Sequence, residues 1–419
     1  MTSVIVVGAG PVGLFLTYSL AKRGIHVDLV ERFDGISKDH RAAGYYGGAV
    51  LALNDAGLLQ LAAKRGYLVQ AVGWRAPPVD DGKGGKTFGR LICHIPFDHG
   101  SEKHPELGML IFPQAKLCEL LEEQIIALGQ NLVTFHFGHE IAGINQTNNG
   151  QTVTATIRDS KTGATCNLKG DFLVGADGGK SATRNLLGIT LQGHTWPERL
   201  IALDVRFALQ NIPKVQLQFI TDPIWYSTVV PLEQPVQGKS SLWRFSMAVD
   251  PKDDSPEEVL LSDKYLAGML ERHMVGPRPL EYEVTNRATY NIHQRLANTM
   301  APMGALGLST GILDAEALGE TLQMIIDDKE PITLLETFSH ERRKVFQNFV
   351  DPTSRANKLR MQQSPEDADG DWVVRLLQNP TDELLKDFFT PYVTVWRSNM
   401  RDVVAKEKER MASVVNGLK

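Results

Sequence analysis

The chain has 419 residues, of which 42% are hydrophobic and 22% charged, and this is the composition of a globular protein with a sizeable core. Its formal net charge of −5 argues against a nucleic-acid-binding protein and against a basic protein of the membrane surface. The three cysteines, Cys93, Cys118 and Cys166, form no CxxC pair, so the sequence indicates neither a disulfide framework nor a metal site.

The N-terminal stretch is apolar, but no basic segment precedes it and glycines and a proline interrupt it, so a signal peptide is not expected. No uninterrupted apolar run reaches the length of about 18 residues that a membrane-spanning helix needs. We therefore expect a cytoplasmic protein without stable membrane insertion.

The N-terminal segment predicts a βαβ unit, with the strand SVIVVGAG, the helix PVGLFLTYSLAKRG and the strand IHVDLVER in this order. Such a unit places its two strands in a parallel sheet that helices cover. A Pro- and Gly-rich loop near residues 75–90 looks like an insertion that leaves this layer. A helix over residues 114–129 and strand segments up to residue 178 then return to it.

Residues 191–292 are dominated by strand-like segments, so we expect a separate and largely antiparallel sheet there. From about residue 308 onward the pattern is mostly helical. The predicted fold class is α/β, with a Rossmann-like domain around a parallel sheet, an antiparallel-sheet domain and a C-terminal helical segment. The expected boundaries are residues 1–75, 105–190 and 295–350 for the discontinuous Rossmann-like domain, 76–104 and 191–294 for the second domain, and 351–419 for the helical region.

The turn between the first strand and the first helix carries a GxGxxG motif made of Gly8, Gly10 and Gly13. The first glycine permits the tight turn, the second leaves room for a pyrophosphate, and the third lets helix and strand pack closely. Glu31 ends the second strand, where a carboxylate accepts hydrogen bonds from a ribose 2′-OH. An acidic residue there disfavours a 2′-phosphate, so the motif indicates FAD or NAD rather than NADP as the tightly held nucleotide.

Four further stretches, RAAGYYGGAV, FPQAKLCELL, LVGADGGKSATR and PMGALGLSTGILDAEAL, follow in an order that resembles the FAD-dependent aromatic hydroxylases, the flavoprotein monooxygenases related to para-hydroxybenzoate and phenol hydroxylases. The resemblance implies that the Rossmann-like domain binds FAD and that the antiparallel sheet belongs to the substrate domain. Besides the glycines and Glu31, the cofactor-binding residues that it implies are Arg32, Arg41, Gln114, Asp177, Gly178, Pro302, Gly304, Gly307, Leu308 and Ser309.

A segment that the family normally has is missing. An apolar strand ending in a Gly-Asp motif usually precedes the last of these stretches, and its aspartate binds the ribityl chain of FAD. Here NIHQRLANTM runs directly into APMGALGLSTG. We therefore expect a deleted or alternatively spliced form with weakened FAD binding. The alternative is that another segment, such as TYNIHQ, shifts into the parallel sheet and restores it.

The resemblance implies a monooxygenase that uses NADPH or NADH as a transient reductant and O₂ to hydroxylate a phenolic or polyketide-like aromatic substrate. The helix that begins near Leu308 would direct its positive N-terminal end at the flavin, although Ser309 also suits an ordinary helix cap. His293 is a candidate for substrate deprotonation, but a lone histidine at a strand end is more often structural. Aromatic candidates for lining the substrate site, each more often plain core, are Trp225, Tyr226 and Trp243.

Two other functions stay open. A catalytically inactive, truncated or spliced flavoprotein remnant would retain only an adenine-nucleotide site. An NAD-dependent dehydrogenase would explain the segment from Gly8 to Glu31 equally well, but it would leave Asp177 and residues 302–311 unexplained. A homodimer is also left open.

Overall fold

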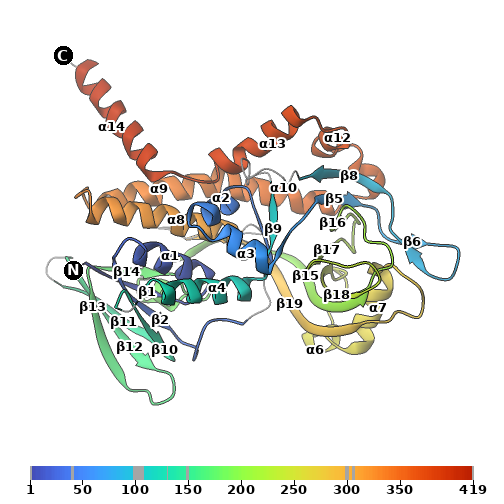
Figure 1. Ribbon diagram of the computed structural model, residues 1–419, viewed down its shortest axis with the longest axis horizontal. Helices are drawn as coiled ribbons and strands as arrows, with labels where there is room; N and C mark the ends of the chain where they lie inside the picture. The colour runs from blue at the N-terminus through green and yellow to red at the C-terminus, as the bar shows by residue number, and fades with distance from the viewer. Residues whose placement is uncertain are drawn as a thin grey trace.

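The computed structural model describes residues 2–38, 42–97, 108–129, 131–147, 151–297, 302–303 and 307–417. A small parallel sheet and its covering helices lie at one end of the molecule, and a large, mostly antiparallel sheet lies at the other (Figure 1). We call these two parts the parallel-sheet body and the large sheet.

The parallel sheet has the strand order β10-β2-β1-β14, and all of its described pairings are parallel. Its strands are β1 (Ser3–Val7), β2 (His26–Glu31), β10 (Val133–Phe137) and β14 (Phe172–Gly175). In β1 the four residues after Ser3 are all buried, because both faces of this sheet are covered. Among the described residues, β14 pairs on one side only, with β1.

One face of the parallel sheet is covered by α1 (Pro11–Ala21), α4 (Gln114–Ala127) and α8 (Gly307–Ile326), which share one core with the sheet. The other face is covered by a three-stranded antiparallel sheet of β11 (His139–Thr147), β12 (Thr152–Asp159) and β13 (Thr165–Gly170). Ile5 and Val7 of β1 pack there against Ile141 and Ile157. The smaller elements of this body are α2 (Gly48–Asp55), α3 (Leu59–Arg65), α5 (Ala182–Leu186), β3 (Gly44–Tyr46), β4 (Tyr67–Leu68) and β9 (Met109–Ile111).

The large sheet has eight strands in the order β20-β19-β15-β18-β17-β16-β5-β8, and only β16 and β5 run parallel. The strands are β5 (Ala71–Arg75), β8 (Leu91–Pro96), β15 (Leu191–Ala208), β16 (Leu217–Ile220), β17 (Ser227–Pro231), β18 (Ser240–Ala248), β19 (Glu283–Ala297) and β20 (Pro302–Met303). Two short helices, α6 (Glu257–Leu260) and α7 (Asp263–His273), cover one of its faces. A short hairpin of β6 (Val79–Asp80) and β7 (Lys86–Thr87) projects from it.

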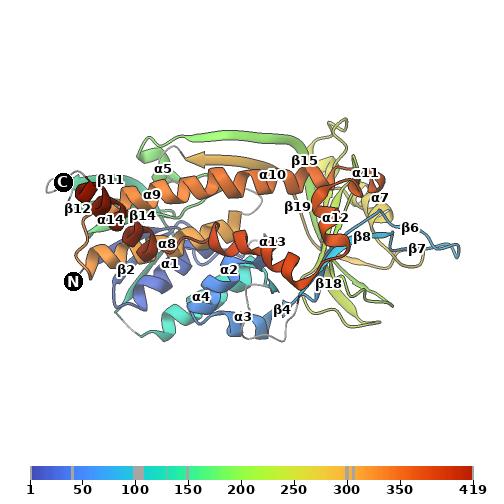
Figure 2. The ribbon, with the colours of Figure 1, turned by 90° about the horizontal axis from the view of Figure 1, so that it is seen from above.

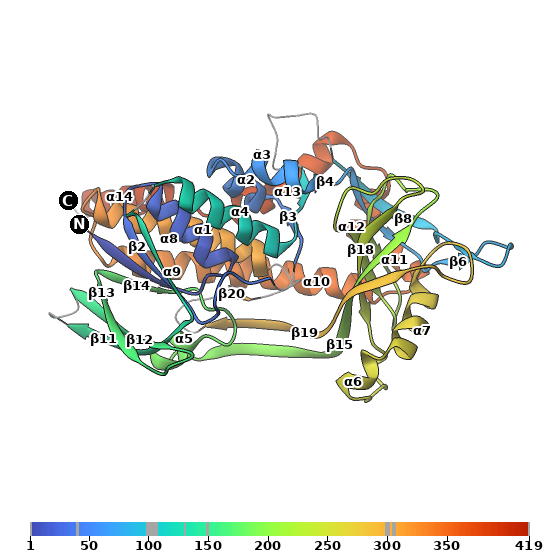
Figure 3. The same cartoon turned by 60° about the horizontal axis from the view of Figure 1, so that its bottom comes forward.

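The opposite face of the large sheet is directed at the parallel-sheet body. Val72, Leu217 and Val230 from this face pack against Tyr67 and Ile111. The long strands β15 and β19 pair along most of their length and run side by side between the two ends of the molecule (Figure 3). This pair therefore connects the large sheet to the parallel-sheet body.

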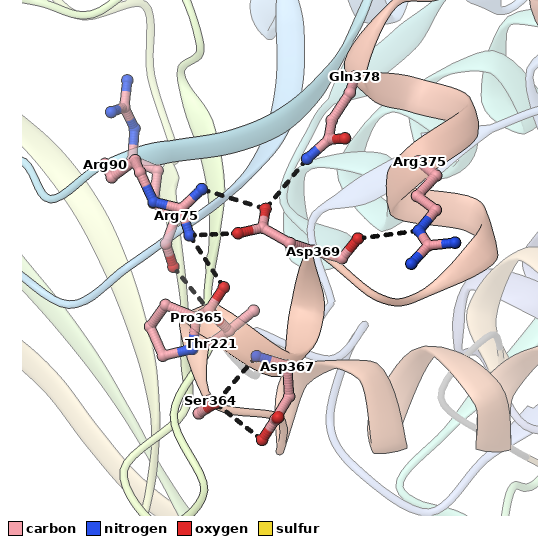
Figure 4. Close-up of polar contacts among 9 residues, drawn as sticks. All are labelled: Arg75, Arg90, Thr221, Ser364, Pro365, Asp367, Asp369, Arg375 and Gln378. Carbon is pink, nitrogen blue, oxygen red and sulfur yellow. Dashed lines mark hydrogen bonds and ion pairs between the residues drawn. The ribbon is translucent and has the colours of Figure 1, made fainter.

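The C-terminal helices form a second connection. The helical elements after α8 are α9 (Leu334–Val345), the π-helical turn η2 (Phe346–Val350), α10 (Asp351–Met361), α11 (Pro365–Ala368), α12 (Trp372–Gln378), α13 (Asp382–Thr394) and α14 (Met400–Gly417). Seen from above, α10 runs from beside α9 to the large sheet (Figure 2). Just after α11, the Asp369 carboxylate accepts two hydrogen bonds from the Arg90 guanidinium, at 3.1 and 2.8 Å, and another from Gln378 (Figure 4).

The predicted fold class is confirmed, because the molecule combines a parallel sheet, an antiparallel sheet and C-terminal helices. The domain boundaries stay a prediction; the strand β5, expected in the first domain, pairs with β16 and β8 of the large sheet. The alternative that TYNIHQ enters the parallel sheet is wrong, since residues 289–294 lie in β19 and pair with β15. In the described ranges no helix is long and apolar enough to span a membrane.

Candidate functional site

The glycine-rich turn between β1 and α1 has three glycines in three different environments. A Cβ added to Gly8, whose φ is +107°, would lie 2.6 Å from the Ala176 carbonyl oxygen, and one added to Gly13 would lie 1.9 Å from the Gly8 oxygen. A Cβ on Gly10 would meet no heavy atom within 4 Å. Two of the glycines are therefore needed for close packing, whereas the open space at Gly10 suits a bulky ligand group such as a pyrophosphate.

Glu31 lies at the end of β2, next to this turn. One of its carboxylate oxygens accepts a hydrogen bond from the Ala9 amide at 2.8 Å, and the other accepts one from the Phe33 amide at 3.1 Å. The carboxylate is thus fixed beside the glycine-rich turn, where a ribose hydroxyl can reach it. The neighbouring Arg32 places its guanidinium 4.6 Å from the centre of the Phe33 ring.

The Asp-Gly turn that follows β14 lies beside the glycine-rich turn. β14 is the parallel neighbour of β1, and the Cα of Asp177 is 2.8 Å from the position of a Cβ on Gly8. The Asp177 carboxylate accepts hydrogen bonds from the Ser181 hydroxyl and from the Thr183 amide, in the first turn of α5. Gly178 has a φ of +78°, which favours glycine.

The N-terminus of α8 reaches the same place from the opposite end of the chain. α8 begins at Gly307, and a Cβ added to Gly311 would lie only 2.6 Å from Cγ2 of Val12 in the first turn of α1. Ser309 is buried, with 4% of its surface exposed. Three turns that are remote in sequence, the turn after β1, the turn after β14 and the first helical turn of α8, therefore meet around the start of α1.

The remaining predicted cofactor residues are placed less completely. Gln114 begins α4, and its amide donates a hydrogen bond to the carbonyl of Ala42 at 3.0 Å. Ala42 follows Arg41, which lies outside the described residues, as does Gly304. Pro302 is described only by its backbone, which pairs with that of Leu296.

The backbone of His293 pairs with that of Thr195 in the β15–β19 ladder, and its side chain is not among those described. Trp243 belongs to the core, which is the more common position for such a residue, because alternation along β18 buries Trp243 and Phe245 on the α7 side of the large sheet. Trp225 lies on that side as well, with the Arg272 guanidinium of α7 stacked 3.7 Å from its ring centre. Tyr226 is 2% exposed and packs against Leu200.

The same alternation directs Arg244 and Ser246 to the face of the large sheet that looks at the parallel-sheet body. The Arg244 guanidinium pairs with both carboxylate oxygens of Asp204 on β15, at 2.7 and 2.9 Å. Asn286 on β19 donates to the same carboxylate at 3.4 Å. This polar cluster lies in a mostly apolar sheet and was not anticipated, although single charges inside LDVRF and LWRFS were its signal in the sequence.

Tyr290 on β19 lies near this cluster, and burial raises the pKa of its hydroxyl, which bonds with Ser246. Yet 40% of the Tyr290 surface is exposed. Tyr290 is thus partly exposed on the face of the large sheet that is directed at the parallel-sheet body.

Comparisons with known proteins agree with this geometry. The family model described as FAD binding domain matches residues 1–353. The para-nitrophenol 4-monooxygenase of a Pseudomonas species (strain WBC-3) is 31% identical, over 87% of this chain and 88% of its own length. The chain belongs to the family of FAD-dependent aromatic monooxygenases.

Two further relatives are similar over nearly their whole length. The 6-hydroxy-3-succinoylpyridine 3-monooxygenase of Pseudomonas putida is 27% identical, over 92% of this chain and 94% of its own. The crystal structure of a p-nitrophenol 4-monooxygenase from Pseudomonas putida has a TM-score of 0.80 at 28% identity and covers 94% of this chain and 98% of that one. FAD is therefore the cofactor of the family, and an NAD-dependent dehydrogenase is excluded. The alternative of an inactive remnant gains no support from these relatives.

Proposed function

We propose that this monooxygenase hydroxylates a phenolic or polyketide-like aromatic ring, with FAD held where the three turns meet and with NADPH or NADH as the reductant. The observation that carries the proposal is the contact of Gly8 with Asp177 on one side and of Val12 with Gly311 on the other. A single extended dinucleotide is the kind of ligand that such separated turns can bind together.

The two halves of FAD would be held by different residues. Glu31 accepts from the adenosine ribose, and the amides around Gly10 and the start of α1 face the pyrophosphate. The flavin end would be held by Asp177, Gly178 and the first turn of α8, with Gln114 as a further candidate contact; the predicted contact of Arg41 lies outside the described residues. FAD, once bound, supplies the transfer of electrons from the nicotinamide to O₂.

The first turn of α8 provides an electrostatic contribution of the protein itself. The first four amides of a helix have no partner inside the helix, and the helix dipole adds a partial positive charge there. Residues Gly307 to Thr310 would therefore favour negative charge on the flavin edge nearest to them. Buried Ser309 leaves little water to compete with that interaction.

The substrate ring would lie between the flavin and the large sheet, beside the partly exposed Tyr290. A hydroxylated ring would accept from or donate to the Tyr290 hydroxyl, while the Asp204–Arg244 pair holds the strands beneath it in register. The relatives named above act on a nitrophenol and on a hydroxypyridine, and both of these rings carry a hydroxyl group. His293 is a further candidate for taking a proton from the substrate.

Because the Gly-Asp strand is missing from the sequence, the proposed affinity for FAD is lower than that of relatives that have this strand. The cytoplasm as the location and a homodimer as the assembly also belong to the proposal. The protein would not need a nucleic acid or a membrane for its activity.

The proposal is tested by NADPH and NADH oxidation with added FAD and 4-nitrophenol, 4-hydroxybenzoate or catechol as the ring compound. We expect oxidation that requires FAD and rises with at least one phenol, together with a hydroxylated product. In the variant Tyr290→Phe, KM for the phenol should rise by a larger factor than Kd for FAD. Reductant oxidation at the rate of a sample without protein would contradict the proposal.

A further inference from the structure

Residues 396–398, between α13 and α14, lie against the first turns of α8. We call this segment the C-terminal clasp. Its first residue, Trp396, has no exposed surface and belongs to the core of the parallel-sheet body, although no cofactor motif is close to it in sequence. The Trp396 ring packs 5.4 Å from the Tyr46 ring and 6.1 Å from the Phe349 ring.

The clasp makes a direct hydrogen bond to the first turn of α8. Trp396 Nε1 donates to the hydroxyl of Thr310 at 3.1 Å, and both side chains are buried. Thr310 is the fourth residue of α8, within the turn whose amides have no helical partner. On the other side of this turn, Gly311 is in close contact with Val12. The start of α8 is therefore held between α1 and the clasp.

A buried arginine fixes the backbone of the clasp to the next turn of α8. Arg342 on α9 donates from Nη1 to the Trp396 carbonyl at 2.8 Å and to the Ser398 hydroxyl at 3.0 Å. Its Nε pairs with Asp314 of α8 at 2.7 Å. Because Arg342 is 3% exposed, these contacts are shielded from water, which strengthens them.

The middle residue of the clasp reaches a second segment near the cofactor. Arg397 pairs with Glu316 of α8 and with Asp55 of α2, at 2.6 Å in each case. Its Cβ would be 3.0 Å from a Cβ added to Gly48, at the start of α2. Gly48 belongs to the stretch RAAGYYGGAV that begins with Arg41.

We propose that Trp396 and Arg397 are positioning residues for the flavin ring. They act by holding the start of α8 and the start of α2 at a fixed separation. The start of α8 is assigned to the flavin end of the site, and the start of α2 belongs to the stretch RAAGYYGGAV, which carries the predicted cofactor residue Arg41. The inference rests on the proposed placement of FAD. Sites of this kind lose much of their affinity when a contact shifts by about 1 Å, so a side chain behind the turn can control binding.

The test compares FAD with ADP, which uses only the half of the site near Glu31. Trp396→Phe keeps an aromatic ring and removes the hydrogen bond to Thr310. We expect Kd for FAD to rise about tenfold in this variant, while Kd for ADP changes less than twofold. The matched control is Trp243→Phe, because Trp243 is equally buried and its Nε1 has no partner among the described residues.

A second variant removes the same hydrogen bond from its other partner, so the test does not depend on correct folding of Trp396→Phe alone. Thr310→Val keeps the branched shape and removes the acceptor, so it should reproduce the tenfold loss for FAD. The double variant should lose no more than either single one, as expected when both changes remove one interaction. An unchanged ratio of the FAD and ADP constants in both single variants would overturn this inference alone. A wild-type protein that binds ADP and not FAD would overturn the proposed function and this inference with it.

Discussion

The Glu31 carboxylate accepts a hydrogen bond from the Ala9 amide at 2.8 Å, across the turn that joins β1 to α1. This contact holds the Glu31 carboxylate in place before any ligand binds. Binding of the ribose therefore does not include the entropy cost of ordering this side chain.

Replacing this carboxylate should weaken FAD binding. A hydrogen bond to a charged group contributes about 1.5–3 kcal/mol, so Glu31→Ala should raise Kd for FAD by about tenfold to a hundredfold. Flavin fluorescence titration of the apoprotein measures the change. Glu123→Ala, which removes an exposed ion pair with Arg65, is the control and should leave Kd unaltered. Equal constants for Glu31→Ala and the wild type would show that Glu31 does not touch the nucleotide.

The glycines of the turn should respond in opposite ways to an added methyl group. At Gly13 a Cβ would lie 1.9 Å from a backbone oxygen, so Gly13→Ala should destabilise the βαβ unit and lower Tm by several degrees. At Gly10 there is open space, so Gly10→Val should fold with a normal Tm and bind little FAD. Thermal unfolding and FAD titration separate the two effects. Normal FAD binding by Gly10→Val would mean that the pyrophosphate lies elsewhere.

His273 should make stability depend on pH below neutrality. Burial, followed by the positive charges of Arg272 and Lys86, lowers the pKa of His273 to about 3, far below its ordinary 6.5. Between these values the unfolded chain binds the extra proton, so the free energy of unfolding falls as the pH falls. From pH 7.5 to 5.5 this loss is about 1.4 kcal/mol.

The comparison of wild type with His273→Gln isolates this contribution. Urea unfolding at pH 7.5 and 5.5 should give a smaller decrease for the variant, by about 1.4 kcal/mol. The same decrease in both proteins would show that groups other than His273 bind the proton responsible for the pH dependence.

The two arginine–aspartate pairs of the large sheet should differ in their effect on stability. Arg244 and Asp204 are buried, at 6% and 0% exposure, so Arg244→Met removes the positive charge beside a buried carboxylate and should cost about 3–5 kcal/mol. Arg90 and Asp369 form a similar pair in solvent, and Arg90→Gln should cost about 0.2–1 kcal/mol. Urea unfolding followed by fluorescence compares them. A similar cost for both would contradict the role given to burial.

Much of the fold could be predicted because periodic patterns and glycine spacing are local. The βαβ unit, the return of a helix at Gln114 and the antiparallel sheet after residue 191 all depend on neighbouring residues in the chain. The glycine-rich turn could be predicted for the same reason, since its shape follows from three glycines and one acid.

The parts that could not be predicted depend on contacts between distant segments. The packing of α7 on one face of the large sheet determines which residues of β18 face the parallel-sheet body. The sequence of β18 alone therefore does not show that Trp243 lies in the core beneath α7. Arg244 finds Asp204 only because β15 and β18 are neighbours. The contact of Trp396 with Thr310 joins residues 86 positions apart, and no pattern in either segment indicates it.

The effect of the missing Gly-Asp strand should appear in the purified protein. If one acceptor for the ribityl chain is lost, affinity falls by about 1.5–3 kcal/mol, and the protein should leave a gel-filtration column with less than one FAD per chain. Added FAD should restore full occupancy. One FAD per chain retained without any addition would show that the affinity is not reduced.

Titration of the apoprotein with FAD in the presence and absence of ADP tests the central claim most directly. We predict saturation at one FAD per chain, competition by ADP at the adenosine end, and reduction of the bound flavin by NADPH or NADH. Two results would contradict a single dinucleotide that lies along the three turns. One is FAD binding that ADP does not displace, and the other is the absence of binding at the highest FAD concentration.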